Sequence, residues 1–305
     1  MRKILAYITF LILPLASLAQ LHVLSDQYVF NGLAINPAYA GSEDALSATL
    51  MYRNQWVGFS GAPKTLTGAI HSPLGKERVA LGLLVLNDII GVNSQTSIMG
   101  NYAYKIEAGP GKLSFGVGVG VTLLDIGWDE LKTIQIDDIE LLGKSEQVSN
   151  PNFSAGVYYK SKQMFLGVSV PFFLSYAYNS SDKSIDLKND ISEYNYHILG
   201  GYIFDISPKL KFQPSALLKY HAGNAVQVDI SPLLILKERM WMGLTFRTND
   251  ALAALIQFAL TEQFKFAYSY DFDISKTGSY HRNSHEVMLK FVLGYKALVA
   301  GPKRF

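Results

Sequence analysis

The feature that most constrains this chain is a two-residue alternation of apolar and polar side chains, broken into about fourteen short segments. In Ser114–Thr122, every second residue is large and apolar, and the residues between them are Ser, Gly or Thr. Phe264–Tyr270 repeats the alternation with aromatic side chains. Successive side chains of a strand point to opposite faces, so each segment presents one face to an apolar medium and one to a polar medium. We predict an all-β fold.

The connections between these segments alternate between short and long. The even-numbered connections are short and rich in Gly, Pro, Lys, Glu or Ser, which are turn-forming residues. The three longest connections are all odd-numbered: Asp125–Asn152, Pro171–Glu193 and Asp271–His285. Because outer-membrane barrels have short periplasmic turns and longer extracellular loops, we predict a transmembrane antiparallel β-barrel with a periplasmic N-terminus. Its strands are expected to begin near Leu46, Lys64, Val79, Thr96, Lys112, Phe153, Met164, Tyr194, Leu210, Ala225, Met240, Ala251, Phe264 and Glu286.

The composition argues against a helical membrane protein. The longest apolar run beyond the N-terminus lies near Ala251–Ile256, far short of the roughly 18 residues of a membrane-spanning helix. The 18 Tyr, 17 Phe and 3 Trp include clusters near the predicted strand ends, as in the interfacial girdles of a barrel. A soluble β-sandwich is the alternative, because alternation alone does not say which face is outside.

The N-terminus resembles a secretory signal. Arg2 and Lys3 precede an apolar stretch, Ile4–Ala16, that is too short to span a bilayer, and small residues precede a predicted cleavage after Ala19. An uncleaved anchor is the alternative. We therefore divide the chain into a signal peptide (1–19), a lead-in (20–45) and an outer-membrane barrel (46–305).

The charge balance and the absence of cysteine exclude several functions. Without Arg2 and Lys3, the 27 basic residues fall to 25, equal to the 25 acidic ones, so no basic excess attracts nucleic acid. The chain has no Cys, which excludes a lipoprotein anchor, disulfides and thiolate metal sites.

The lead-in is a candidate plug. A barrel of about fourteen strands is too wide for its own side chains to fill, so its lumen needs a plug, a ligand or a partner. Asn36-Pro37 and Gly41 form a rigid turn before the first strand. We predict that residues 20–45 tuck against or into the periplasmic mouth as a partial plug, and a simple ordered lead-in strand is the alternative.

Three glycines of one predicted strand bear on the same question. Gly116, Gly118 and Gly120 occupy one face of that strand. Inward-facing glycines either leave room for another backbone or only permit curvature of the sheet, and the sequence leaves both readings open.

Charged residues in the predicted strands are candidates for a luminal site. The lipid face penalises Arg or Lys by about 2–4 kcal/mol at mid-bilayer, so we expect such residues to face the lumen. We predict a network there, which either binds a partner or is structural ion pairing that fills the lumen. Its candidate members are Arg53, Gln55, Lys219, Asp229, Arg247, Glu286 and Lys290.

The first predicted extracellular loop, Gly58–Lys64, supplies three further candidates. Trp56 ends the first strand, Phe59 lies within the loop and Lys64 ends it. An exposed aromatic side chain is suited to partner contact, although an anchoring role at the membrane interface is the alternative.

Catalytic constellations are lacking in the sequence. Ser284, His285 and Glu286 are adjacent in a predicted strand, so their side chains alternate between faces and cannot form a relay. The acidic pair Asp271 and Asp273 is assigned to an outer loop, where such residues are usually solvated, with a calcium site as the alternative. We predict no enzyme activity, no cofactor and no metal.

Several sequence blocks resemble those of a known family. Tyr28–Ile35, Asn36–Ser42 and Tyr52–Gly58, in this order, are similar to the PorP/SprF family of outer-membrane proteins of the type IX secretion and gliding machinery. Two departures affect the extreme N-terminus: Gln20–Val23 replaces the usual Gln-Asp-Pro stretch, and Asn31-Gly32 replaces an Asn-Pro.

The resemblance implies a non-enzymatic barrel that docks or anchors particular secreted surface proteins, such as adhesins with a C-terminal sorting domain. Its other expected partners are type IX secretion components and outer-membrane lipid, with no nucleic acid. The main alternative is an outer-membrane channel or transporter for small solutes.

Overall fold

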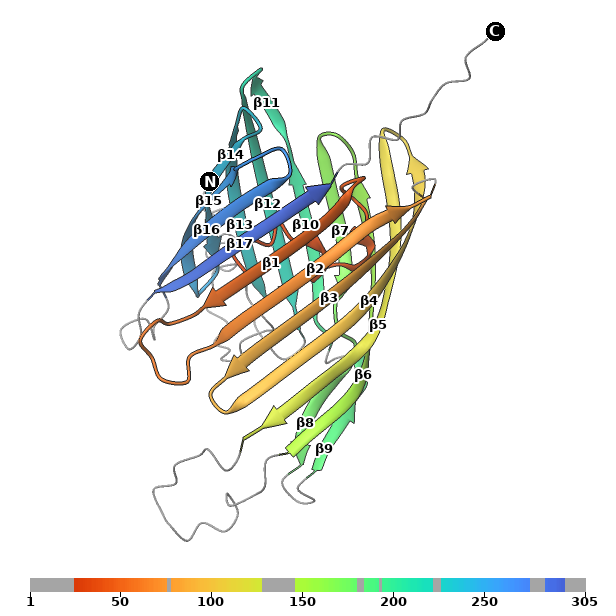
Figure 1. The fold of residues 1–305 in the computed structure, drawn as a ribbon, viewed down its shortest axis with the longest axis vertical. Coiled ribbons are helices and arrows are strands. Elements are labelled where there is room, and N and C mark those ends of the chain that lie inside the picture. The colour runs from red at the N-terminus through yellow and green to blue at the C-terminus, as the bar shows by residue number, and fades with distance from the viewer. Residues whose placement is uncertain are drawn as a thin grey trace, which may run out of the picture.

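The fold is a closed antiparallel barrel, as predicted. The computed structural model describes residues 25–75, 78–127, 146–179, 184–191, 194–221, 226–274 and 283–293, and the predicted signal peptide lies outside these ranges. Across the described residues, 14 strands form the barrel (Figure 1). They are β1 (Leu46–Asn54), β2 (Lys64–Leu74), β3 (Val79–Ile90), β4 (Asn93–Ala108), β5 (Gly111–Ile126), β6 (Glu146–Lys160), β7 (Met164–Val170), β10 (Tyr196–Tyr202), β12 (Leu210–Tyr220), β13 (Gln227–Leu236), β14 (Met240–Arg247), β15 (Ala251–Ala259), β16 (Phe264–Asp273) and β17 (Ser284–Leu293).

The barrel closes where the first strand meets the last. Strand β1 pairs with β17 from Leu46↔Leu293 to Asn54↔His285, and every other barrel strand pairs with its neighbours in chain order. A short strand, β11 (Phe204–Ser207), continues the line of β10 and pairs with the start of β12. Among the described residues, no helix is long and apolar enough to cross a membrane.

The two faces of the wall have opposite character. On β5, Phe115, Val117 and Val119 are 47%, 57% and 60% exposed, while the alternating Ser114 and Gly116 are buried. An exposed apolar outside and a buried polar inside are expected of a barrel in lipid, and the reverse is expected of a soluble sandwich. This arrangement decides between the two alternatives that alternation alone left open.

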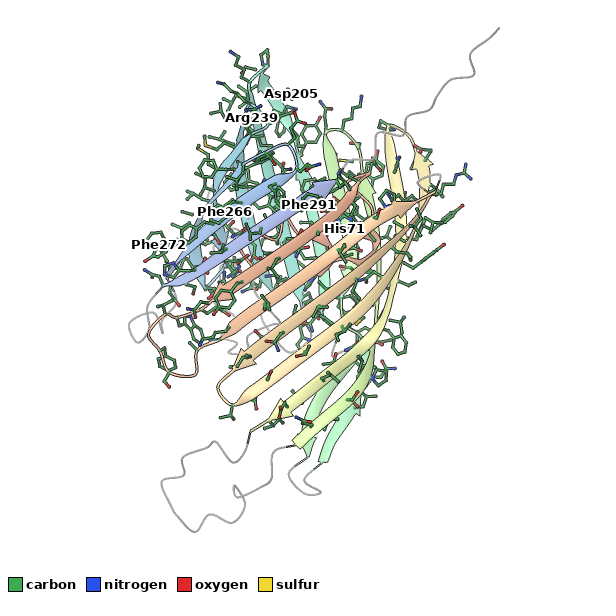
Figure 2. The ribbon with its side chains drawn as sticks, viewed as in Figure 1. His71, Asp205, Arg239, Phe266, Phe272 and Phe291 are labelled. Carbon is green, nitrogen blue, oxygen red and sulfur yellow. The ribbon has the colours of Figure 1, made fainter. Side chains whose placement is uncertain are left out.

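The two ends of the barrel can be told apart by the connections. Antiparallel strands alternate in direction, so all odd-numbered connections, including the three longest, leave from one end. We call this the outer end (bottom of Figure 1) and the opposite one the periplasmic end, following the loop rule of outer-membrane barrels. In Figure 2, Asp205 and Arg239 lie at the periplasmic end.

The loop boundaries differ from the prediction. Strand β6 begins at Glu146 rather than near Phe153, and β8 (Ser175–Asn179) and β9 (Ser184–Lys188) form a separate hairpin within the predicted loop Pro171–Glu193. Asp271 and Asp273 belong to β16, so their assignment to a loop was wrong. The first residues of β6, 146–152, are nearly all polar and show no alternation, whereas the end of β16 does alternate, with Phe272 exposed and Asp271 buried.

Residues 25–45 lie inside the barrel, and we call them the luminal segment. They contain two short 3₁₀ helices, η1 (Gly32–Ala34) and η2 (Pro37–Tyr39), and η2 contacts β4, β5 and β6. The apolar side chains of the segment are buried against three sides of the wall: Tyr28, Phe30, Leu33, Ile35, Ala38 and Tyr39. The segment therefore supplies a hydrophobic core in a lumen whose wall is largely polar.

Candidate functional site

The outer half of the lumen holds a network of buried charges centred on Asp26. Its carboxylate bridges two arginines from well-separated strands: Arg53 Nη1 lies 2.5 Å from Oδ2, and Arg247 Nη2 lies 3.0 Å from Oδ1. Burial alone would raise the pKa of Asp26, but the two guanidinium groups hold it below its usual range. One side chain of the luminal segment is thus bound to β1 and β14 at once.

Further ion pairs extend this Asp26 network around the wall. Arg53 also pairs with Glu286 at 2.9 Å and with Asp271. Arg247 Nε lies 3.2 Å from Asp229, whose second oxygen lies 2.9 Å from Lys219 Nζ. All of these side chains are nearly inaccessible to solvent, so each charge depends on its partners for compensation.

A second network holds the luminal segment at the periplasmic end. Lys290 Nζ pairs with Glu43 and donates to the Phe30 carbonyl at 2.9 Å. Burial raises the pKa of Glu43, but Lys290 and His71 outweigh it and lower the pKa to about 2. The other contacts reach backbone groups: Gly41 N donates to His71 Nδ1 at 3.1 Å, Lys160 Nζ donates to the Ser42 carbonyl at 2.9 Å, and Lys105 donates to the Gly41 carbonyl.

Between the two networks, the segment lies close to the backbone of the wall. Asn36 Nδ2 donates to the carbonyls of Val157 (3.0 Å) and Val168 (3.3 Å), while its Oδ1 accepts from Ala38 N at 2.9 Å. A Cβ built on Gly116 would overlap the backbone of Ala38. Gly116 therefore does leave room for another backbone.

The neighbouring glycines of β5 serve a different purpose. A Cβ on Gly118 would overlap Ser154 and Asn101, and one on Gly120 would overlap the Ile98 carbonyl and Met99. These neighbours belong to the barrel wall itself. Close approach of the luminal segment thus explains one of the three glycines, and packing within the wall explains the other two.

The structure brings together five of the ten predicted site residues. Arg53, Lys219, Asp229, Arg247 and Glu286 all belong to the Asp26 network. The other five candidates lie apart from it, at positions that differ in burial.

Of those five, Lys290 lies in the periplasmic network. Gln55 is buried just beyond β1, and the Trp56 amide donates to Ser284 Oγ at 3.2 Å. Phe59 is 52% exposed, and Lys64 begins β2 with an exposed side chain.

Sequence reasoning missed three acidic members: Asp26, Glu43 and Asp271. One signal could have found them. The predicted luminal set contained four basic side chains but only two acidic ones, Asp229 and Glu286, so buried acidic partners had to come from elsewhere.

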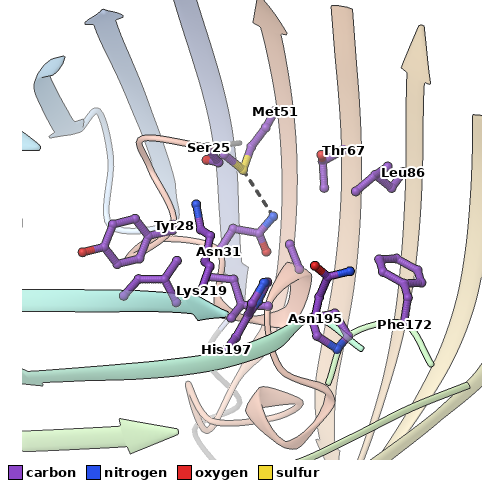
Figure 3. Close-up of a pocket in the computed structure, with 14 residues that line it drawn as sticks. Ser25, Tyr28, Asn31, Met51, Thr67, Leu86, Phe172, Asn195, His197 and Lys219 are labelled. Carbon is purple, nitrogen blue, oxygen red and sulfur yellow. Dashed lines mark hydrogen bonds between the residues drawn. The ribbon is translucent and has the colours of Figure 1, made fainter. Parts of the chain in front are cut away.

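On the outer side of the luminal segment, the lumen contains a cavity of about 60 Å³, which we call the well (Figure 3). Tyr28 and Ile35 of the segment contribute to its floor. Its walls come from the outer halves of β1, β3 and β12 and the residues after β7, and they are mainly apolar: Met51, Leu86, Leu217 and Phe172. Asn31 Nδ2 lies 3.2 Å from Met51 Sδ at its edge.

The three adjacent residues that suggest a relay separate in the structure. Ser284 Oγ accepts from Trp56, His285 Nδ1 lies 2.6 Å from Tyr268 Oη, and Glu286 belongs to the Asp26 network. Across the described part of the chain, no group of three or more His, Cys, Asp or Glu side chains could hold a metal ion.

Several solved structures resemble this chain at low sequence identity. Omp33 of Acinetobacter baumannii is 8% identical, with a TM-score of 0.48 over 82% of this chain and 98% of that one. A FadL homologue of Pseudomonas aeruginosa is 11% identical, with a TM-score of 0.49 over 86% and 94%. CymD, a monoaromatic hydrocarbon channel, is 9% identical, with a TM-score of 0.48 over 88% and 92%.

Comparison of the sequence identifies the family. No curated protein matches the chain. Residues 17–291 match the family described as type IX secretion system membrane protein PorP/SprF, which covers the luminal segment and nearly the whole barrel. The match agrees with the resemblance of the blocks around Asn36 and Tyr52. The chain belongs to the PorP/SprF family of type IX secretion system membrane proteins, and its barrel lies in the outer membrane.

Proposed function

We propose that this protein is a non-enzymatic docking component of the type IX secretion machinery, which holds a secreted surface protein at the outer end of its barrel. Membership of the family supports a role in this machinery. The docking role itself rests on one observation: the lumen is occupied by the chain's own residues 25–45, which leave an apolar well in its outer half.

The occupied lumen favours docking over the alternative, a channel for small solutes. A solute channel needs a continuous polar path. Here Asp26 binds both β1 and β14 across the lumen. Tyr28, Leu33 and Tyr39 of the same segment are buried inside the barrel. We therefore assign the luminal segment the role of a plug that closes the barrel.

The outer well gives the docked partner a defined anchoring point. Apolar side chains such as Met51, Leu86 and Phe172 surround it, and an aromatic or aliphatic side chain in a desolvated pocket is a common source of binding energy between proteins. The partner is a secreted protein with a C-terminal sorting domain, for example an adhesin. Phe59, exposed in the first outer loop, adds a contact at the rim.

Site-specific photocrosslinking on intact cells tests the docking surface. His197 lines the well, and its neighbour Ile198 on β10 is 43% exposed on the lipid face. Benzoylphenylalanine at position 197 should capture a secreted surface protein, and the same residue at 198 should not. Equal capture at both positions, or none at 197, contradicts the proposal.

Deletion of the protein tests the function in the cell. The surface proteome of the deletion strain should lose one or two proteins with sorting domains, while uptake of small solutes is unchanged. An unchanged surface proteome with impaired solute uptake would instead support the channel.

A further inference from the structure

A second cavity opens at the opposite end of the barrel from the well. It has a volume of about 360 Å³, and its lining contains four lysines and two acidic residues: Lys105, Lys112, Lys160, Lys162, Asp44 and Glu107. These residues come from the periplasmic ends of β4, β5 and β6, from the turn after β6, and from the end of the luminal segment. The cavity lies within the size range of ligand sites, roughly 300–1,000 Å³.

The lining carries an excess of positive charge. Asp44 is shared between two lysines, because its carboxylate lies 3.5 Å from Lys112 Nζ and 3.7 Å from Lys105 Nζ. Its side chain is 52% exposed, so water weakens both attractions. Glu43, the preceding residue, pairs with Lys290 and also attracts Lys160, which leaves the four lysines in excess over Asp44 and Glu107 in the lining. The cavity thus retains a positive field directed at the periplasm.

The cavity faces the lumen and not the lipid. On β4, buried Lys105 alternates with Tyr104 and Ile106, which are exposed on the outer surface of the wall. On β6, buried Tyr158 alternates with exposed Val157. A lipid headgroup would have to leave its leaflet to reach the lysines, whereas a soluble chain reaches them directly from the periplasm.

We propose that this lysine cavity is the docking site for an acidic polypeptide segment of a periplasmic partner. Lysines are flexible point charges with three donors each, so several of them can adapt to the carboxylates of a short extended segment. The walls add neutral groups that can donate to such a segment, among them Ser114, Tyr158 and Ser161. The barrel then holds a secreted partner at its outer end and a second protein at its periplasmic end.

Peptide binding to the full-length protein in nanodiscs of neutral lipid tests this site. Fluorescence anisotropy with labelled hexaglutamate and hexaglutamine peptides should detect binding of hexaglutamate alone. Raising KCl from about 0.1 to 0.5 M should weaken it, because added salt screens charge. Equal binding of the two peptides overturns the proposal.

Matched variants then locate the site. The double variant Lys112→Gln/Lys162→Gln should raise Kd for hexaglutamate about tenfold, whereas Lys209→Gln/Lys237→Gln, in other periplasmic turns, should leave it unchanged. Glu107→Gln removes an acidic residue of the cavity, across from Lys112 on β5, and should tighten binding. Equal effects of the two double variants, or no effect of Glu107→Gln, contradict the assignment.

Two competitors exclude other ligands. Complete displacement of the peptide by millimolar inorganic phosphate would make this a small-anion site and overturn the peptide assignment. Loss of peptide binding in nanodiscs that contain phosphatidylglycerol would assign the lysines to lipid instead. Either result leaves docking at the outer well unaffected, because the crosslinking at His197 tests that separately.

Discussion

The outer and periplasmic halves of the lumen hold the same segment by different means. In the outer half, the side chain of Asp26 bridges Arg53 and Arg247. In the periplasmic half, lysines and a histidine mainly bind backbone groups, such as the carbonyls of Gly41 and Ser42. The outer contacts therefore depend mainly on the side chain of Asp26, whereas the periplasmic contacts, apart from the Glu43–Lys290 pair, depend on the path of the chain.

Asp26→Asn should have the largest effect. It leaves two buried guanidinium groups without their shared carboxylate, and breaking a buried ion pair from one side costs about 3–5 kcal/mol. Urea unfolding in detergent, followed by tryptophan fluorescence, measures the loss. A variant as stable as the wild type would show that Asp26 does not bind the segment to the wall.

Glu43→Gln should cost less and should change the pH dependence. The pKa of Glu43 is lowered from 4.5 to about 2 in the folded state, so its contribution is complete above about pH 4.5 and is lost as the pH falls toward 2. The shift corresponds to at most about 3 kcal/mol. Between pH 4.5 and 2, urea midpoints should fall further in the wild type than in the variant. If the urea midpoints of the wild type and the variant fall in parallel with pH, the charge of Glu43 does not stabilise the fold.

Gly116→Leu tests the contact between the two networks. The new side chain meets the backbone of Ala38, and overpacking of this kind costs about 1–3 kcal/mol. Val117→Leu, on the adjacent lipid face, is the matched control and should be nearly neutral. Equal unfolding midpoints for the two variants would mean that the segment does not pack against β5.

Ser42→Ala should have the smallest effect. Lys160 binds the backbone carbonyl of Ser42, which any residue supplies, so we expect a change below about 0.5 kcal/mol. A loss comparable to that of Asp26→Asn would erase the difference between the two halves. Urea unfolding under the same conditions makes the comparison direct.

Most of the barrel could be predicted from the sequence because lipid and lumen impose opposite polarity on alternate residues. Predicted and observed strands begin together at Leu46, Lys64, Val79, Met164 and Leu210, where the alternation starts abruptly. The sequence pattern could not locate the start of β6 or the hairpin of β8 and β9. The first residues of β6 are nearly all polar, and β8 and β9 alternate over only five residues each, which is too short a pattern to locate a strand within a long connection.

The luminal site was less predictable. Strand periodicity identifies which charges face inward, and five of the ten candidate residues meet in one network. The acids at positions 26 and 43 lie outside the barrel strands, where no periodicity indicates the direction of a side chain. The outer well and the lysine cavity depend on how the luminal segment runs through the barrel, and no local sequence pattern predicts that path.

Ion conductance in planar bilayers tests the central claim, that residues 25–45 close the lumen, most directly. The intact protein should show no sustained current, and a variant lacking residues 21–35, which removes Asp26 and the floor of the well, should conduct ions. Refolding of the variant is checked by the heat-dependent shift of barrels on gels. Sustained conductance by the intact protein, or identical traces from the two, would contradict the account and favour a solute channel.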